Sequence, residues 1–336
     1  MAAVHWANRA SFHKVCAIIS IYLASCSSGA KFISDRPETR SPQTRLTVTD
    51  GELGSSPRFI VYGDMRFTDA RETAASQPSP RRSIVARIAS EQPDAVFLTG
   101  DIPWHGGNEA DYGVFQKETA AWRNEQLRVF PVLGNHEFKG CAEVVCLARW
   151  WQTFPQQNGR RWYTVRLGTR LQFFALDSVS SLLPGGEQGQ WLQQQLDGLS
   201  PTVRFVVVLL HHPPITDYIA GARGNETALA KQLAAAASGS RARFIVCAAH
   251  VHNYERFQRD GIVFLVSGGG GGKPEFVNRS TADLYQSGEF PNFHYLRFEL
   301  TARQLRGEMV RLSDVNAPSG PTWAVRDNFE VDAKTP

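Results

Sequence analysis

Phe59-Ile60-Val61-Tyr62-Gly63-Asp64 is an apolar, β-rich run that is followed at once by a glycine and a carboxylate. Four further apolar runs are also followed by polar groups, which are Gly100-Asp101, Gly134-Asn135-His136-Glu137, His211-His212-Pro213-Pro214 and His250-Val251-His252. Each apolar run predicts a buried β-strand, so each polar group lies where a strand ends. Ligands of open α/β sheets bind at the carboxyl ends of strands. We therefore expect these polar side chains to converge on one rim.

Helical patterns alternate with the strands, which predicts a layered α/β fold. The expected strands are 59–62, 95–99, 129–133, 171–176, 205–210 and 244–248, with helices at 83–91, 110–124, 187–197 and 227–237. Three later strands, 262–267, 294–300 and 305–311, have no long helix between them. No internal repeat and no linker after Pro57 is visible. Residues 58–332 are therefore expected to form one domain.

The first 25 residues have the pattern of an export signal. Arg9 and Lys14 precede an apolar core of about 10 residues, which is too short for a membrane span of about 20. Leu23-Ala24-Ser25-Cys26 resembles the bacterial lipobox, in which the cysteine is lipidated. We expect a periplasmic or cell-envelope lipoprotein, with an ordinary cleaved signal as the alternative. Residues 26–57, rich in Ser, Thr, Pro and Gly, are predicted to be a flexible tether.

Composition excludes several classes of protein. Of 336 residues, 42% are hydrophobic and 20% are charged, which excludes a disordered chain. The 36 basic and 32 acidic residues give a net charge of +4 without any Lys/Arg block, so no nucleic-acid partner is expected. The leader itself contains two of those basic residues and no acid. Membrane contact is expected only through the lipid anchor.

The polar residues at the strand ends are typical metal ligands. Carboxylates, a carboxamide and imidazoles suit a hard or borderline divalent or trivalent ion. A single Gly-Asp after a strand is usually a turn. Five polar groups in succession, each at a strand end, favour a functional site over five separate turns.

The ordered motifs resemble those of the calcineurin-like metallophosphoesterase superfamily over about residues 58–300. The block His250-Val251-His252-Asn253-Tyr254-Glu255-Arg256 and the Gly-rich stretch 267–272 are most similar to the purple acid phosphatase branch. The resemblance implies a four-layer α/β/β/α sandwich of two mixed sheets, with a dinuclear metal centre between the sheets. It also implies six metal ligands, which are Asp64, Asp101, Asn135, His211, His250 and His252. Asp101 would bridge the two ions, and Asp64 and His252 would complete the first site.

The same resemblance implies a reaction. A metal-bridging hydroxide would attack the phosphorus in line, and His136 would protonate the leaving oxygen or stabilise the phosphorane. His212 is expected to be a less suitable ligand than His211, whose spacing to proline matches the family pattern. The metals could be Mn, Fe or Zn, because the ligand set contains no thiolate.

Two residues depart from the family pattern. Arg66 stands where many members have a ligating histidine, and Trp104 stands where purple acid phosphatases have a metal-binding tyrosine. Neither side chain can ligate a metal. Arg66 could bind phosphate oxygens as a fork, or it could pair with Asp69 or Glu72. His105 could contact substrate at the mouth of the cleft, or it could be an ordinary loop histidine.

Cys141 and Cys146 flank a short apolar segment after the Gly-Asn-His-Glu motif, and a disulfide between them is plausible in an oxidising compartment. The function expected is metal-dependent hydrolysis of a small phosphate ester, with a phosphomonoesterase preferred. A phosphodiesterase acting on cyclic nucleotides or other diesters is the first alternative. A non-catalytic family member that binds phosphate or glycan is the second.

Overall fold

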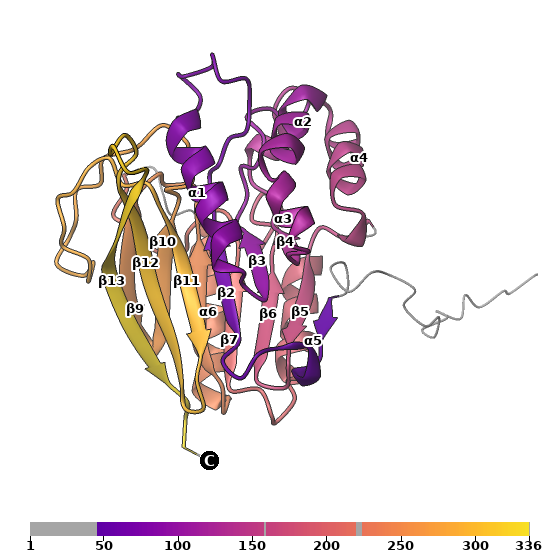
Figure 1. Cartoon of the computed structure of the whole chain (residues 1–336). Coiled ribbons are helices and arrows are strands. Elements are labelled where there is room, and N and C mark those ends of the chain that lie inside the picture. The colour runs from indigo at the N-terminus through magenta and orange to yellow at the C-terminus, as the bar shows by residue number, and fades with distance from the viewer. Residues whose placement is uncertain (1–45, 158, 220–223, 336) are drawn as a thin grey trace, which may run out of the picture. The chain divides into compact units, whose positions relative to one another are not determined.

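Two mixed β-sheets lie face to face in the computed structural model, which describes residues 46–157, 159–219 and 224–335 (Figure 1). The first sheet has the order β13-β12-β11-β2-β3-β4, and the second has the order β1-β5-β6-β7-β8-β10-β9. The first contains β2 (Arg58–Tyr62), β3 (Ala95–Leu98), β4 (Val129–Pro131), β11 (His294–Leu300), β12 (Gln304–Asp314) and β13 (Thr322–Asp332). The second contains β1 (Thr47–Val48), β5 (Tyr163–Leu167), β6 (Leu171–Ala175), β7 (Phe205–Leu209), β8 (Arg243–Ala248), β9 (Tyr254–Arg259) and β10 (Ile262–Ser267).

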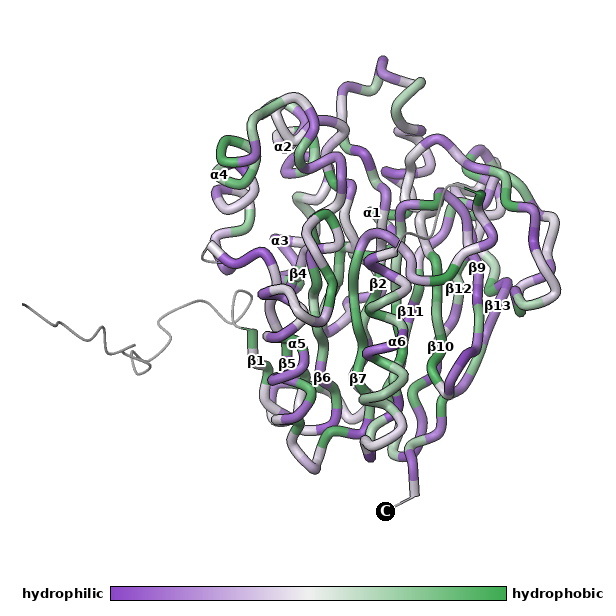
Figure 2. The backbone as a smooth tube through the Cα atoms, turned by 180° about the vertical axis from the view of Figure 1, so that it is seen from behind, coloured by the Kyte–Doolittle hydropathy of each residue, from purple (hydrophilic) through white to green (hydrophobic). Residues whose placement is uncertain are grey.

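Helices cover the outer faces of both sheets. The outer face of the first sheet packs against α1 (Pro78–Glu91), α2 (Glu109–Glu118), α3 (Ala120–Asn124) and α4 (Glu143–Thr153). The outer face of the second packs against α5 (Glu187–Asp197) and α6 (Gly224–Gly239), which lie in front of apolar strands in Figure 2. Short 3-10 helices occur at η2 (Asp50–Glu52), η3 (His136–Phe138) and η4 (Pro155–Gln157). The predicted four-layer sandwich is confirmed.

Aromatic rings fill the space between the sheets. Phe59 of β2 stacks on Phe298 of the neighbouring antiparallel strand β11 with ring centroids 4.7 Å apart, and Phe97 stacks on Phe173 of the opposite sheet at 4.2 Å. Alternation along β2 directs Phe59 into this core and Ile60 toward the helices, so the whole run is apolar because both of its faces are buried.

Parallel pairing brings the motif residues to one edge of the sheets. β2, β3 and β4 are parallel neighbours in the first sheet, and β7 and β8 are parallel neighbours in the second. Their carboxyl ends therefore lie on the same side of each sheet. The loops that follow these strands contain all six expected metal ligands.

The largest difference from the sequence prediction lies in residues 46–57, which we expected to belong to the tether. Thr47–Val48 forms β1, which pairs in parallel with β5, and Val48 is buried in the core between the sheets. The Ser, Thr and Gly content of this segment concealed a strand of only two residues. Thr47 and Val48 therefore belong to the folded domain and not to a tether.

Several other elements also differ from the prediction. The expected helix 110–124 is interrupted at Thr119, whose hydroxyl donates to the Phe115 carbonyl at 2.6 Å. The expected helix 83–91 begins earlier, at Pro78, because proline is tolerated in the first turn. Strands β5, β9 and β13 and helix α4 were not predicted.

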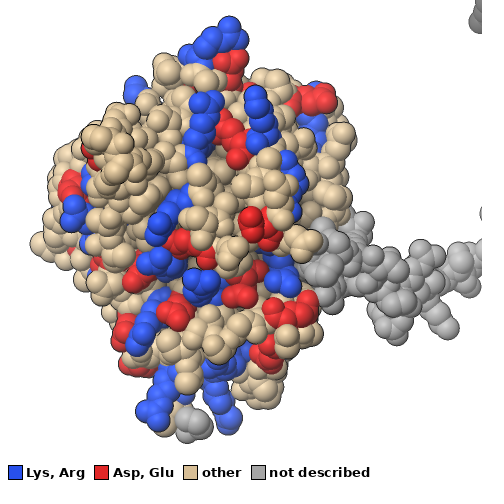
Figure 3. Space-filling view, in the orientation of Figure 1, with Lys and Arg blue, Asp and Glu red and all other residues tan. Residues whose placement is uncertain are grey.

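The export signal, the lipobox and Cys26 lie outside the described residues. Among the residues that are described, no helix is both long and apolar enough to cross a membrane. Basic and acidic side chains are interspersed on the face shown in Figure 3. One of their ion pairs joins Arg297 to Glu91 at 3.0 Å.

Candidate metal centre

Asp64 and Asp101 form sharp turns directly after β2 and β3. Both carboxylates are fully buried, and both residues have left-handed φ angles, 58° for Asp64 and 54° for Asp101. The aspartates themselves therefore adopt the left-handed conformation at these turns. Gly63 is needed for space instead, because a Cβ there would lie 2.4 Å from the Thr99 hydroxyl oxygen. Gly100 is needed both for space and for its own positive φ of 91°.

The first group of prospective ligands consists of Asp64, Asp101 and His252. Each offers one ligand atom, and these atoms lie within 4.8 Å of one another. His252 Nδ1 lies 2.5 Å from the Lys273 carbonyl oxygen, which places the ring hydrogen on Nδ1 in the neutral form and directs Nε2 toward Asp64 Oδ1 at 3.4 Å. Neither of these two buried atoms has a hydrogen-bond partner within the described chain. A cation between them would satisfy both.

Burial is the largest single effect on the pKa of His252 and lowers it, but the attraction and hydrogen bonding of Asp64, together with the charge of Glu275, outweigh burial and raise this pKa. A proton and a metal ion therefore compete for the same nitrogen.

The second group lies around Asn135, His211 and His250. His211 Nδ1 lies 2.9 Å from the Thr99 carbonyl oxygen, so in the neutral ring Nε2 holds the lone pair. That atom lies 3.0 Å from Asn135 Oδ1, 3.3 Å from Asp101 Oδ1 and 3.3 Å from His250 Nδ1. Electron-rich atoms that converge in this way repel one another unless a cation lies among them. The donor set thus fits a second metal ion, with Asp101 shared between the two groups.

His212 also belongs to a possible ligand group with His211 and His250. Its Nδ1 lies 3.0 Å from the Ser178 hydroxyl, which in turn accepts a hydrogen bond from the His212 backbone N–H. The structure therefore brings both histidines of the pair to the site. The contact with Asn135 and Asp101 is made by His211.

His136 lies beside the Asp101 carboxylate, which the two ligand groups share. Its backbone N–H donates to Asp101 Oδ1 at 2.9 Å, and its Nε2 is 3.7 Å from Asp101 Oδ2. Its Nδ1 faces the Trp104 carbonyl oxygen at 2.6 Å. Burial lowers the pKa of His136 to about 4, and Asp101 opposes this shift only in part. The free site therefore holds a neutral imidazole with its hydrogen on Nδ1.

Arg66 points into the site and not toward the surface carboxylates considered as alternatives. Its Nη2 lies 3.3 Å from Asp101 Oδ2, and its guanidinium carbon lies 5.1 Å from the centre of the Trp104 ring. Asp69 pairs with Arg71 instead, at 2.7 Å. Burial raises the pKa of Asp101, but electrostatic interactions with His211, His136 and Arg66, together with the hydrogen bond from the His136 N–H, outweigh burial and hold it well below its usual range.

Trp104 stands at the position where purple acid phosphatases have a metal-binding tyrosine. Its indole is an aromatic platform against which other rings and cations pack. The His136 ring lies 4.6 Å from its indole and the His105 ring 5.1 Å. His105 is half-buried, and its backbone N–H donates to Asp111. The structure thus places His105 next to the site's aromatic platform, where no direct contact with a prospective ligand is recorded among the described residues.

Three functional residues were missed in the sequence. Glu137 is buried and accepts hydrogen bonds from the backbone N–H groups of Asp101, Ile102 and Gly134 at 3.0, 2.8 and 2.7 Å. Burial and the nearby Asp101 raise the pKa of Glu137 to about 8. Glu275 accepts from the His252 backbone at 3.1 Å, and Lys139 lies 3.3 Å from His136 Nε2. Only Glu137 had a signal, its place in the Gly-Asn-His-Glu motif.

The loop after η3 is fixed by a disulfide between Cys141 and Cys146, with Cα atoms 5.7 Å apart. This is the pairing expected from the sequence. Cys247 is a buried thiol whose pKa is raised by burial.

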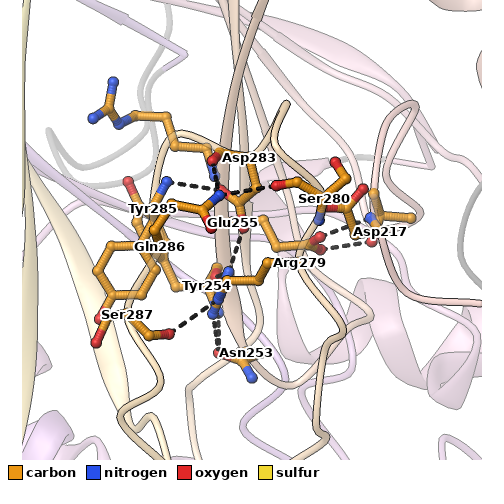
Figure 4. A network of polar contacts seen from close by, with 12 residues as sticks. Asp217, Asn253, Tyr254, Glu255, Arg279, Ser280, Asp283, Tyr285, Gln286 and Ser287 are labelled. Carbon is orange, nitrogen blue, oxygen red and sulfur yellow. Dashed lines mark hydrogen bonds and ion pairs between the residues drawn. The ribbon is translucent and has the colours of Figure 1, made fainter.

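A third cluster of carboxylates, formed by Asp217, Glu255 and Asp283, lies around the start of β9, the strand that follows His252 (Figure 4). Glu255 accepts from the Thr216 hydroxyl at 2.6 Å and the Asp217 N–H at 2.7 Å. Asp283 pairs with Arg279, and Asp217 accepts from the Ser280 N–H at 2.6 Å. These carboxylates accept hydrogen bonds or form ion pairs with donors of the protein itself.

Comparison with solved structures identifies proteins of the same fold. A purple acid phosphatase from yellow lupin (Lupinus luteus) seeds aligns at a TM-score of 0.66 and 18% identity, covering 84% of this chain and 55% of the lupin chain. The chain thus spans about half the length of that protein. A dimetal phosphatase from Danio rerio aligns at a TM-score of 0.57 and 14% identity, covering 83% of this chain and 99% of the other. The GAP50 anchor of the inner membrane complex of Plasmodium aligns at 0.56 and 16%, covering 84% and 90%.

No curated protein sequence gives a significant match. The family model described as calcineurin-like phosphoesterase matches residues 57–254, more than half of the chain. This matched region contains all six prospective metal ligands, Arg66 and His136. The chain therefore belongs to the calcineurin-like phosphoesterase family.

Proposed function

We propose that this phosphoesterase hydrolyses phosphomonoesters with two metal ions. The observation that carries the proposal is the pair of ligand groups that share Asp101, with Arg66 held against that same carboxylate at 3.3 Å. The first ion would be held by Asp64, Asp101 and His252, and the second by the remaining ligands together with Asp101. Their identity as Mn, Fe or Zn is left to elemental analysis.

Bound cations would lower the pKa of a water molecule and neutralise charge on the phosphoryl group. The protein's own contribution is to hold the substrate. Arg66 presents a planar fork that can bind two phosphate oxygens. The phosphoryl group of a monoester has three non-bridging oxygens, whereas that of a diester has two. A monoester therefore leaves more oxygen atoms for the guanidinium once the ions are satisfied.

His136 is the side chain best placed to transfer a proton. Because its Nδ1 hydrogen faces the Trp104 carbonyl, Nε2 can donate a proton only in the imidazolium form. The binding of an anionic substrate next to this ring would favour that form. His136 would then protonate the departing oxygen or stabilise the negative charge that develops on phosphorus.

The test is hydrolysis of p-nitrophenyl phosphate and bis-p-nitrophenyl phosphate by the purified protein, together with its metal content. Turnover of the monoester in preference to the diester supports the proposal. Preference for the diester would favour a phosphodiesterase. The absence of turnover in folded, metal-containing protein would favour a binding module, an option of interest because one neighbour, GAP50, is described as an anchor.

Two adjacent substitutions separate metal binding from chemistry. Asn135→Ala should lower activity because metal is lost, whereas His136→Ala should lower the rate with metal retained. An unchanged rate in His136→Ala would contradict its role in the reaction.

We also propose that the protein is exported and anchored through Cys26, on the pattern of the sequence before that residue. Mass spectrometry of the protein expressed in a bacterium tests this. A lipid-modified N-terminal Cys26 supports the anchor, and an unmodified N-terminus at another residue contradicts it.

A further inference from the structure

We propose that Lys139 and Trp104 form a subsite for a leaving group that carries its own negative charge. This inference rests on the proposed phosphomonoesterase function and names the class of ester it would prefer. The Lys139 ammonium nitrogen lies 4.1 Å from the centre of the Trp104 ring and 3.3 Å from His136 Nε2. It therefore lies on the side of the site where His136 would meet the departing oxygen.

The Lys139 charge is not neutralised by a protein carboxylate. Within the described part of the chain, no carboxylate oxygen lies within 4.0 Å of its nitrogen, whereas Arg66, on the same indole, pairs with Asp101. An ammonium that is half-buried beside a second cation is destabilised unless an anion reaches it. A negatively charged group on the substrate would supply the anion that the Lys139 ammonium lacks.

The Lys139 backbone is held in place by the neighbouring loop. The Gly107 N–H donates to the Lys139 carbonyl at 2.8 Å, and the Gly106 N–H donates to the His136 carbonyl at 2.8 Å. The two loops approach so closely that a Cβ at Gly106 would lie 1.7 Å from the Glu137 carbonyl oxygen. Two residues after Lys139, Cys141 is anchored by its disulfide to Cys146. Lys139 is thus positioned by backbone contacts and does not lie on a free loop.

In the reaction, a bond forms between the water oxygen and phosphorus, and the bond from phosphorus to the ester oxygen breaks. The electron pair leaves with that oxygen, which takes up one proton, so the products are orthophosphate and an alcohol. When the alcohol also contains a carboxylate close to the ester oxygen, Lys139 can bind this carboxylate both before and after cleavage. A neutral alcohol offers no such contact.

The experiment compares two esters that differ in this charge, phosphoglycolate and 2-hydroxyethyl phosphate. We expect the wild-type protein to prefer phosphoglycolate in kcat/KM. Lys139→Met, which keeps the length of the side chain over Trp104, should lower the preference about tenfold, the effect of losing one charged contact. Lys139→Arg should retain most of it. Lys231→Met, an exposed lysine of α6, is the matched control.

An equal loss for both esters in Lys139→Met, or no loss for either, would overturn the inference while leaving the phosphatase function intact. If folded, metal-containing wild-type protein hydrolyses neither ester, calorimetric binding decides on the subsite, and the proposed function fails only if p-nitrophenyl phosphate is not hydrolysed either. Tighter binding of phosphoglycolate than of orthophosphate, lost in Lys139→Met, would then support the subsite. Equal binding of the two ligands would reject it.

Discussion

Arg66 Nη2 lies 3.3 Å from Oδ2 of Asp101, the carboxylate that both groups of prospective metal ligands share. His211 Nε2 and the His136 N–H approach the other oxygen, Oδ1, at 3.3 and 2.9 Å. The guanidinium thus occupies one side of the shared carboxylate, at the position where the family resemblance would place a metal-binding histidine. A fixed positive charge there opposes a cation at Oδ2 and attracts a phosphate anion.

Replacing Arg66 should separate these two effects. Arg66→Ala should weaken the binding of orthophosphate about tenfold or more, because a charge-assisted contact contributes about 1.5–3 kcal/mol. The metal content should stay the same or rise, since a competing cation has been removed. Inhibition by orthophosphate and elemental analysis of the same sample measure both quantities.

The matched control for this substitution is Arg71→Ala, which removes an arginine paired with Asp69 at the exposed surface. It should change neither quantity. The interpretation is wrong if Arg66→Ala loses metal while its affinity for orthophosphate stays at the wild-type value.

We expect Glu137 to stabilise the folded protein as well as to support the site. Glu137→Ala leaves three buried N–H donors without their acceptor, those of Asp101, Ile102 and Gly134. Each such donor costs about 1–3 kcal/mol, so we expect the free energy of unfolding to fall by about 3 kcal/mol or more. Glu137→Gln, which keeps one acceptor oxygen, should cost less. Urea denaturation measures the difference, with the exposed Glu72→Ala as control. Equal stability of the two Glu137 variants would contradict this account.

The parts of the fold that sequence reasoning predicted are those determined by local pattern. The run at Phe59 and the polar residues after each strand reveal a buried parallel strand and a functional edge, because both faces of such a strand are apolar and its end is polar. The six prospective metal ligands were implied by the family resemblance, and they lie among these same polar residues. The two-residue strand at Thr47 has no local signal, since it exists only because β5 pairs with it.

The supporting residues of the site could not be predicted for a similar reason. Lys139 and Glu275 are ordinary surface-type residues in the sequence, and only the folded loops bring them to His136 and His252. Glu255 lies in the block that resembles the purple acid phosphatase branch, which gave it no specific role. Its contacts with Thr216 and Asp217 make it part of the scaffold.

The disulfide between Cys141 and Cys146 should stabilise the loop that positions Lys139. It closes a short segment, with a sequence separation of 5, so chain entropy predicts a contribution of about 2 kcal/mol. The double variant Cys141→Ser, Cys146→Ser should lose this amount in urea denaturation. Reductant should lower the stability of the wild-type protein similarly and leave the double variant unchanged. A further loss in the reduced double variant would mean that another thiol or disulfide is responsible.

Glu255 should make stability depend on pH. Burial is the main cause that raises its pKa from the ordinary value near 4.5 to about 7, and the hydrogen bonds from Thr216 and Asp217 oppose this shift only in part. Between pH 4.5 and 7 the folded protein therefore retains a proton that the unfolded chain releases. Stability from this group is fully present at low pH and is lost as the pH rises through that window.

Glu255→Gln removes this titration while keeping an acceptor oxygen for Thr216. The stability of Glu255→Gln minus that of the wild-type protein should therefore rise with pH, by about 1–3 kcal/mol between pH 5 and pH 8. Thr216→Val removes the 2.6 Å hydrogen bond that favours the charged form of Glu255. In that variant the pKa of Glu255 should therefore rise further, and the loss of stability with pH should extend to higher pH than in the wild-type protein. Urea denaturation at pH 5, 6, 7 and 8 gives both comparisons, and because other titrating groups are shared, they cancel in the differences. A difference that stays constant with pH would show that Glu255 is already ionised in the folded protein at pH 5.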